Sequence, residues 1–329
     1  MAKKVIIDTD PGLDDALALF LALGAPELEV LGLTTVAGNV PLDTATRNAQ
    51  RVLTLAGYDH LPVVPGAAVP LLRPLQTAGN LHGRDGLGDI LPDPEAADPP
   101  LVEQWRSPNT PPKPPFPANK AHVAGRAPAF IQEMARKYRH ELTIIALAPL
   151  TNLALALRGD PELAGQLKEI IVMGGVFTQP GNVTPRAEFN IYVDPEAARV
   201  VLQAGVPLRL VGLEIGRQTR LTEKDLAHLP TGRSPRLDFV KKAVEFWSEK
   251  DTEGLPLYDP TAVAMAIAPD LFEVTEVFVD VETSGQLTTG ETVADFRGRW
   301  KKSPNAKVAL KIDREAFLAR FLRAISSDR

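Results

Sequence analysis

Short aliphatic runs alternate with segments of helical periodicity along the chain as far as residue 211. The short runs are apolar at consecutive positions, which is typical of parallel strands buried on both faces of a sheet. The longer segments repeat their apolar residues with the period of a helix. We therefore expect an α/β fold with an open, mostly parallel, twisted sheet flanked by helices, of the Rossmann-like kind. The expected strands are 4–7, 30–36, 61–64, 142–147, 169–173 and 208–211, and the expected helices are 13–23, 42–56, 122–138, 150–157 and 195–204.

The last third of the 329-residue chain follows a less regular pattern. No internal repeat divides the chain, and α/β folds of roughly 250 residues commonly form one unit. A single domain spanning residues 1–329 is therefore the expectation. In this last part the pattern predicts helices at 234–251, 259–268 and 314–325, and strands at 272–281 and 307–311.

One segment breaks the alternation, because ten prolines fall within residues 92–117. Proline lacks a backbone N–H and fixes φ, so this segment can form neither a helix nor a central strand. We expect a Pro-rich surface insertion at about residues 92–119. Its role stays open between a tolerated insertion, a lid over a substrate and a subunit contact.

Composition excludes several classes of function. The chain has no cysteine, which excludes disulfides, thiol nucleophiles, cysteine-based zinc sites and iron–sulfur clusters. A net charge of −5 argues against a nucleic-acid binder. No apolar run reaches the roughly 18 residues of a membrane span, and the apolar run after Lys4 is too short for a signal peptide. We therefore expect a cytoplasmic enzyme that binds neither nucleic acid nor membrane.

The most informative stretch is an acidic turn after the first expected strand. Four carboxylates fall there within eight residues: Asp8, Asp10, Asp14 and Asp15. Helix capping explains one or two of them, but like charges held close together repel one another. A divalent cation removes this conflict, and all-oxygen ligands select a hard ion such as Ca²⁺ or Mg²⁺. The turn also lies where ligands bind in parallel sheets, at the carboxyl end of a strand.

An ordered set of short stretches runs along the chain. They are DTDPGLDDALAL at 8–19, VAGNV at 36–40, HGRDGLG at 82–88, APLTNLA at 148–154, VMGG at 172–175, GNVTP at 181–185 and AEFNIYVDPEAA at 187–198. Together, from residue 5 to about 270, they resemble the inosine–uridine-preferring nucleoside hydrolases. The resemblance implies a single-domain, open α/β sheet. It also implies an enzyme that cleaves the N-glycosidic bond of ribonucleosides, giving ribose and free base, with a tightly bound Ca²⁺.

The resemblance further implies roles for individual residues. Three carboxylates would bind Ca²⁺, those of Asp10, Asp15 and Asp259. The backbone carbonyl of Leu147 would complete the ligand set, and Asp14 would hold the ribose 2′-hydroxyl. Asp10 would also take the proton from the attacking water. The remaining ribose hydroxyls would be bound by Asn39, Asn182, Glu188 and Asn190.

The implied reaction builds positive charge on the sugar, as glycoside hydrolysis does, and carboxylates around the sugar would stabilise that charge. If the segment around Glu188 is extended, its i, i+2 spacing to Asn190 places both side chains on one side. By the same resemblance, the chain would be a homodimer or homotetramer that acts on small-molecule ribonucleosides in nucleoside salvage.

One position departs from the family pattern. Purine-accepting members usually carry histidine before Asp-Pro, as the acid that protonates the leaving base, whereas here the residue is Tyr258. Tyrosine has a reference pKa near 10, so it is a poor acid at neutral pH, but it can donate a hydrogen bond. Three outcomes stay open. Tyr258 donates to the base or stacks on it, His82 takes over as the acid, or the leaving group needs little protonation.

Two alternatives to a ribonucleoside hydrolase also stay open. The first is a non-catalytic nucleoside- or ribose-binding protein, which is motivated by Tyr258 alone. The second is a hydrolase of another N-riboside, such as nicotinamide riboside, whose cationic leaving group needs no acid. The sequence does not distinguish purine from pyrimidine substrates.

Overall fold

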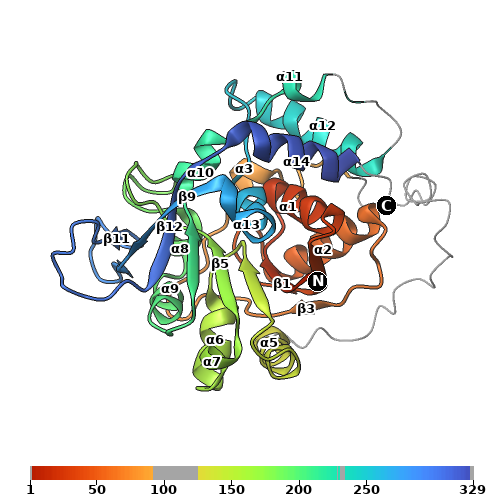
Figure 1. The fold of residues 1–329 in the computed structure, drawn as a ribbon. Coiled ribbons are helices and arrows are strands. Elements are labelled where there is room, and N and C mark those ends of the chain that lie inside the picture. Colours follow the sequence, from red (N-terminus) through yellow and green to blue (C-terminus); the bar gives the residue numbers. More distant parts are fainter. Residues whose placement is uncertain (1, 92–124, 228, 230–233, 327–329) are drawn as a thin grey trace.

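The computed structural model describes residues 2–91, 125–227, 229 and 234–326 (Figure 1). A central sheet runs through this part of the chain, and helices pack on both of its faces. The expected Pro-rich insertion at about 92–119 lies outside the described residues. The expected single domain over 1–329 stays a prediction.

The central sheet is open and mostly parallel, which confirms the expected fold class. Its eight strands, in spatial order, are β3 (Val63–Pro65), β2 (Leu28–Thr35), β1 (Lys3–Thr9), β4 (Thr143–Ala146), β5 (Glu169–Met173), β6 (Leu208–Val211), β12 (Ala306–Ile312) and β9 (Phe272–Val277). Neighbouring strands of this sheet are parallel except for β12 and β9. Strands β3 and β9 form its two edges, so the sheet is not a closed barrel.

Two apolar cores lie on opposite faces of this sheet. Val5 and Ile7 of β1 belong to one core, and Ile6 belongs to the other. Alternate residues of a strand face opposite sides, which explains the continuous apolar runs in the sequence. The first core is covered by α1 (Leu13–Gly24), α2 (Leu42–Ala56), α12 (Pro235–Ser248), α13 (Tyr258–Ile267) and α14 (Arg314–Ser326). The second is covered by α5 (Arg126–Lys137), α6 (Thr151–Gly159), α7 (Leu163–Gln166) and α9 (Pro195–Leu202).

The order of the strands determines where a ligand can lie. The chain moves outward from β1 through β2 to β3, and then returns to the other side of β1 as β4. The reversal between β1 and β4 is a topological switch point, where the loops after the two strands part and leave a crevice. Asp8 lies level with Ala146 on β4. The loops that begin at Asp10 and Leu147 therefore open at the same level of the sheet.

Short elements complete the described part of the chain. They are α3 (Gly79–His82), α8 (Phe189–Val193), α10 (Leu213–Gln218), β7 (Arg220–Leu221), α11 (Glu223–Leu226), β8 (Leu255–Pro256), η1 (Pro269–Leu271), β10 (Val279–Val281) and β11 (Thr292–Ala294). β7 pairs with β8 and β10 pairs with β11, each in an antiparallel two-stranded sheet. Among the described residues, no helix is long and apolar enough to cross a membrane.

The expectation of one strand over 272–281 is wrong. β9 ends at Val277, and β10 begins at Val279 in a different sheet. Asn305 explains the break, because its Oδ1 accepts a hydrogen bond from the Val279 N–H at 2.8 Å and its Nδ2 donates to the Val279 carbonyl at 2.9 Å. These side-chain bonds occupy the backbone groups that a continuing strand would use. The expected helix 122–138 is present as α5, and the start of the expected range lies outside the described residues.

Candidate functional site

The acidic turn is held rigidly at the carboxyl end of β1. The strand ends at Thr9, Asp10 follows it, and Gly12 is the N-cap residue of α1. The Asp15 carboxylate accepts hydrogen bonds from the Thr9 hydroxyl at 2.5 Å and from the Gly12 N–H at 2.9 Å. The local sequence therefore fixes this carboxylate before any ligand binds.

The structure brings carboxylates from distant parts of the chain together at this turn. One oxygen from each of Asp14, Asp15 and Asp259 lies within 4.8 Å of the others. Asp259 comes from the first turn of α13. Asp10 is linked to this group by Asn39, in the loop after β2. The backbone N–H of Asn39 donates to Asp10, and its Nδ2 donates to Asp15 at 3.2 Å. The aspartates expected at the site therefore belong to one cluster: Asp10, Asp14, Asp15 and Asp259.

Burial and mutual repulsion raise the pKa values of this cluster. The pKa of Asp10 is well above its usual range, chiefly because of burial and then because of the charge of Asp15. Burial and the neighbouring carboxylates likewise hold the pKa of Asp259 well above its usual range. Burial, together with the Asp15 charge, raises the pKa of Asp14 to about 8. The carboxylates therefore cannot all be ionised without a compensating cation.

A hard divalent cation fits this donor set, which consists of oxygen atoms only. Asp10 and Asp15 have no exposed surface, and Asp259 is 3% exposed, so water cannot screen their charges. The Leu147 carbonyl accepts a hydrogen bond from Asn190 Nδ2 at 2.9 Å and keeps a second lone pair for a cation. These donors could therefore hold a hard divalent cation.

The cluster opens into a cavity of about 300 Å³. Nine of the residues expected at the site line it: Asp14, Asn39, His82, Leu147, Asn182, Glu188, Asn190, Tyr258 and Asp259. Asp10 and Asp15 lie behind this wall, bound to Asn39. The structure adds an apolar and aromatic part of the wall, formed by Leu81, Val183, Phe189, Trp247, Leu255 and Pro256. Trp247 lies in the last turn of α12, and the others lie in loops or short elements, where the sequence gives no spacing signal.

Glu188 and Asn190 reach the cavity from the start of a helix. Residues 189–193 form α8, so the segment does not continue as the extended strand considered from the sequence. Glu188 is the N-cap residue of α8, and its carboxylate accepts from the backbone N–H groups of Gly175 at 3.0 Å and Asn190 at 2.9 Å. Burial raises the pKa of Glu188 to about 7. Asn190 orients the Leu147 carbonyl, so the two residues support different parts of the site.

His82 and Asn182 are both fixed by backbone groups. The Leu13 N–H donates to His82 Nδ1 at 3.2 Å, which places the ring proton on Nε2. A Cβ atom on Gly12 would lie 2.7 Å from the same nitrogen, so the turn needs glycine to admit the imidazole. Burial, and then the charge of Lys250, lowers the pKa of His82 to about 4, so the ring is neutral at pH 7. Asn182 Oδ1 accepts from the Phe189 N–H at 3.0 Å.

The metal-free protein is expected to lose stability as the pH rises from about 4 to about 8. The pKa values of Asp14 (about 8) and Glu188 (about 7) are raised on folding, so the folded state binds these protons more tightly than the unfolded chain does. The stabilisation from each group is complete at pH values below its pKa in the unfolded chain, and it is lost above its pKa in the folded protein. The shift of Glu188 from 4.5 to about 7 alone corresponds to about 3 kcal/mol.

The measurement is the Tm of chelator-treated protein at pH 5, 6.5 and 8. We expect a decrease of about 5 °C or more across this range. Protein reloaded with Ca²⁺ is the control, and its Tm is expected to rise over the same range, because protons compete with the metal for the carboxylates. Metal-free protein that is more stable at pH 8 than at pH 5 would contradict the raised pKa values.

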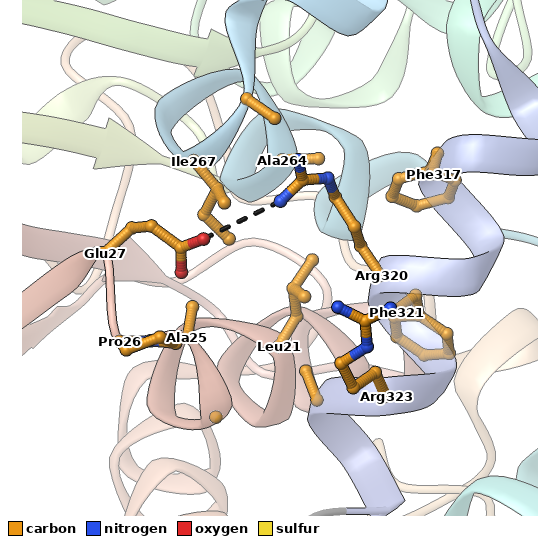
Figure 2. A pocket seen from close by; sticks show the side chains of 13 residues that line it. Leu21, Ala25, Pro26, Glu27, Ala264, Ile267, Phe317, Arg320, Phe321 and Arg323 are labelled. Carbon is orange, nitrogen blue, oxygen red and sulfur yellow. Dashed lines mark ion pairs between the residues drawn. The ribbon is translucent and has the colours of Figure 1, made fainter.

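A second cavity, of about 210 Å³, lies between the end of α1 and the helices α13 and α14 (Figure 2). Its lining is mainly apolar and includes Leu21, Ile267 and Phe321. Glu27 is the one carboxylate among the described residues that line it, and it forms an ion pair with Arg320 at 3.6 Å. None of the residues expected at the site lines this cavity, so the acidic cavity is the candidate active site.

Comparisons with known proteins agree with this site. The inosine-uridine preferring nucleoside hydrolase family matches residues 5–319. The pyrimidine-specific ribonucleoside hydrolase RihA of Salmonella schwarzengrund (strain CVM19633) is 38% identical over 325 residues, which cover 97% of this chain and 96% of the relative. Among solved structures, a plant nucleoside hydrolase, the PpNRh1 enzyme, is 34% identical with a TM-score of 0.85, and the match covers 99% of this chain and 100% of that chain.

A purine-preferring ribonucleoside hydrolase from Gardnerella vaginalis is 29% identical with a TM-score of 0.83, and the match covers 98% of each chain. These matches span nearly the whole chain and include the acidic turn and the Asp259 region. The fold class expected from the sequence and the resemblance of its motifs are thereby confirmed. The chain belongs to the inosine–uridine preferring nucleoside hydrolase family, and it is an N-glycosyl hydrolase of ribonucleosides.

Proposed function

We propose that this chain is a Ca²⁺-dependent ribonucleoside hydrolase that prefers pyrimidine ribonucleosides. One observation carries the proposal: a buried carboxylate cluster opens into a small cavity whose lining combines amides and carboxylates with apolar and aromatic groups. Asp10, Asp15, Asp259 and the Leu147 carbonyl would hold the ion. When bound, Ca²⁺ would supply Lewis-acid chemistry and a template for the water and the ribose hydroxyls.

The cavity favours a nucleoside over a nucleotide. Its volume of about 300 Å³ lies at the small end of the range for small-molecule sites. Among the described residues that line it there is no lysine or arginine, whereas Asp14, Glu188 and Asp259 are present. A phosphate group would therefore meet negative charge without a compensating cation from the protein.

The residues around the cavity have different roles in binding and cleaving the ribonucleoside. Asp10 accepts the proton of the attacking water, as the family resemblance implies, and the Asn39 N–H holds its carboxylate in place. Asp14 and the amides of the wall bind the ribose hydroxyls, because amides both donate to and accept from hydroxyl groups. The carboxylates stabilise the positive charge that develops at C1′. A 2′-deoxynucleoside would leave Asp14 without a partner and is expected to react poorly.

The leaving base lies against the apolar part of the wall, next to Tyr258 and His82. His82 is neutral at pH 7 and has its proton on Nε2, so it acts there as a hydrogen-bond donor and not as an imidazolium acid. Support for pyrimidines comes from the relative that is 38% identical, which is named as pyrimidine-specific, whereas the relative named as purine-preferring is 29% identical.

The experiment is release of ribose from uridine, cytidine, inosine, adenosine, guanosine and nicotinamide riboside, with and without prior chelation. We expect turnover of uridine and cytidine at least about tenfold above that of the purine nucleosides. Turnover should disappear on chelation and return with Ca²⁺. Faster cleavage of nicotinamide riboside than of uridine would support the N-riboside alternative. No release by calcium-loaded protein would favour a binding protein.

We also propose that the chain forms a homodimer or homotetramer in the cytoplasm, as its family resemblance implies. Light scattering of the full chain measures the assembly directly. A monomer at micromolar concentration would contradict this part of the proposal.

A further inference from the structure

The ring of Tyr258 packs directly against the backbone of α10. A Cβ atom added to Gly216 would lie 1.9 Å from Cδ1 of this ring, 2.5 Å from Cε1 and 2.8 Å from Cγ. Gly216 has no positive φ, and alanine is the better residue within a helix, so the backbone itself does not require glycine here. What requires the glycine is the tyrosine ring that it admits.

Helix α10 is anchored to the rest of the fold by its polar side chains. Glu214 is buried, and its Oε1 accepts a hydrogen bond from the Phe177 N–H at 2.7 Å. Gln218 Nε2 donates to the Leu310 carbonyl of β12 at 3.1 Å. Because these bonds hold the helix in a close-packed interior, a methyl group added at Gly216 would displace the tyrosine ring and not the helix.

The displaced ring would move into the cavity of the candidate active site. Tyr258 lines this cavity, whereas Gly216 is not among the lining residues, so the ring lies between the helix and the cavity. Carbon atoms in contact lie about 3.5 Å apart, so the ring would have to move by roughly 1.5 Å. In a cavity of about 300 Å³, this shift would take space from a bound molecule.

The two parts of a nucleoside would feel this shift differently. In the proposed reaction the ribose lies beside the carboxylate cluster, and the base lies next to Tyr258. A ring that projected further into the cavity would therefore compete with the base and leave the ribose in place. In an apolar pocket, a mismatch of one methylene is worth about 10–200-fold in discrimination.

We propose that Gly216 sets the size of the subsite for the base. By letting the Tyr258 ring lie against α10, it keeps that ring out of the space that the base occupies. Gly216 touches no substrate atom and is a positioning residue that acts through Tyr258. The inference rests on the proposed function, because it concerns the part of the same cavity that takes the base.

The test compares Gly216→Ala, Tyr258→Ala and the double variant in the full, calcium-loaded chain. We expect Gly216→Ala to raise the KM for uridine about tenfold or more. The Ki of ribose, measured as an inhibitor of uridine cleavage, should stay within about twofold of wild type, because ribose has no base to meet the displaced ring. In the Tyr258→Ala background all three contacting ring atoms are gone, so Gly216→Ala should change the KM for uridine by less than about threefold.

Gly165→Ala is the matched control, because an added Cβ atom on this glycine of α7 would meet nothing within 4 Å. It should leave the KM for uridine and the Ki of ribose within about twofold of wild type. The role of Gly216 would be overturned by equal rises of KM and Ki in Gly216→Ala, or by an undiminished rise of KM in the Tyr258→Ala background. If Gly216→Ala does not fold, the double variant should fold, and its failure to do so would also overturn that role.

The proposed function and this inference fail in distinguishable ways. Wild-type protein that cleaves no ribonucleoside would overturn the proposed function and this inference with it. Wild-type cleavage of uridine with a KM that Gly216→Ala leaves unchanged would overturn this inference alone.

Discussion

Exchanging Asp10 for asparagine is expected to lower kcat on ribonucleosides by about 10³-fold or more. The side chain keeps its shape, but it can no longer accept a proton from the attacking water, and loss of a general base alone typically costs about 10²–10⁴-fold. Asp10 is fully buried and held by Asn39, so another carboxylate cannot move into its place without disturbing the turn. Release of ribose from uridine, followed under saturating Ca²⁺, measures the loss.

Asp8→Asn is the matched control, because Asp8 lies two residues before Asp10 and is also fully buried. Its Oδ1 accepts hydrogen bonds from Thr34 and from Asn152 at 2.8 Å, and it lines neither cavity. This variant should keep kcat within about tenfold of wild type. If Asp10→Asn kept that much activity, the role of proton acceptor would belong to a different residue.

The parts of the fold that could be predicted from sequence are those set by local patterns. Strands such as β1 are buried on both faces, so their apolar runs are unambiguous, and helix α2 was predicted with the boundaries that the structure has, 42–56. The break between β9 and β10 could not be predicted in this way. It depends on Asn305, a residue distant in sequence whose side chain takes the backbone groups of Val279.

The same distinction applies to the candidate site. The acidic turn is one contiguous motif, so its aspartates could be recognised together, and Asp259 could be added only by resemblance to a family. The helix that begins after Glu188 could not be predicted, because a glutamate that caps a helix has the same i, i+2 spacing to Asn190 as one in a strand.

Asp259→Asn is expected to change stability in opposite directions with and without metal. In the metal-free protein, burial and then repulsion from the neighbouring carboxylates raise the pKa of Asp259. The asparagine amide carries no charge, so the substitution removes this repulsion. The Tm of the metal-free variant at pH 8 should therefore equal or exceed that of metal-free wild type.

With Ca²⁺ the order reverses, because the variant has lost one of the proposed ligands. Wild type at about 1,000 times its Kd should gain about 4 kcal/mol, which corresponds to a rise of roughly 6 °C in Tm for a chain of this length. Asp259→Asn should lose most of this rise.

Asp8→Asn is the control that separates metal binding from simple removal of a buried charge. Burial raises the pKa of Asp8 to about 6, so its removal should also stabilise the metal-free protein at pH 8, yet the shift with Ca²⁺ should persist. If Asp259→Asn kept the full rise in Tm with Ca²⁺, the ion would bind elsewhere. If both variants lost the rise, the loss would be due to the missing buried charge at the turn and not to a missing metal ligand.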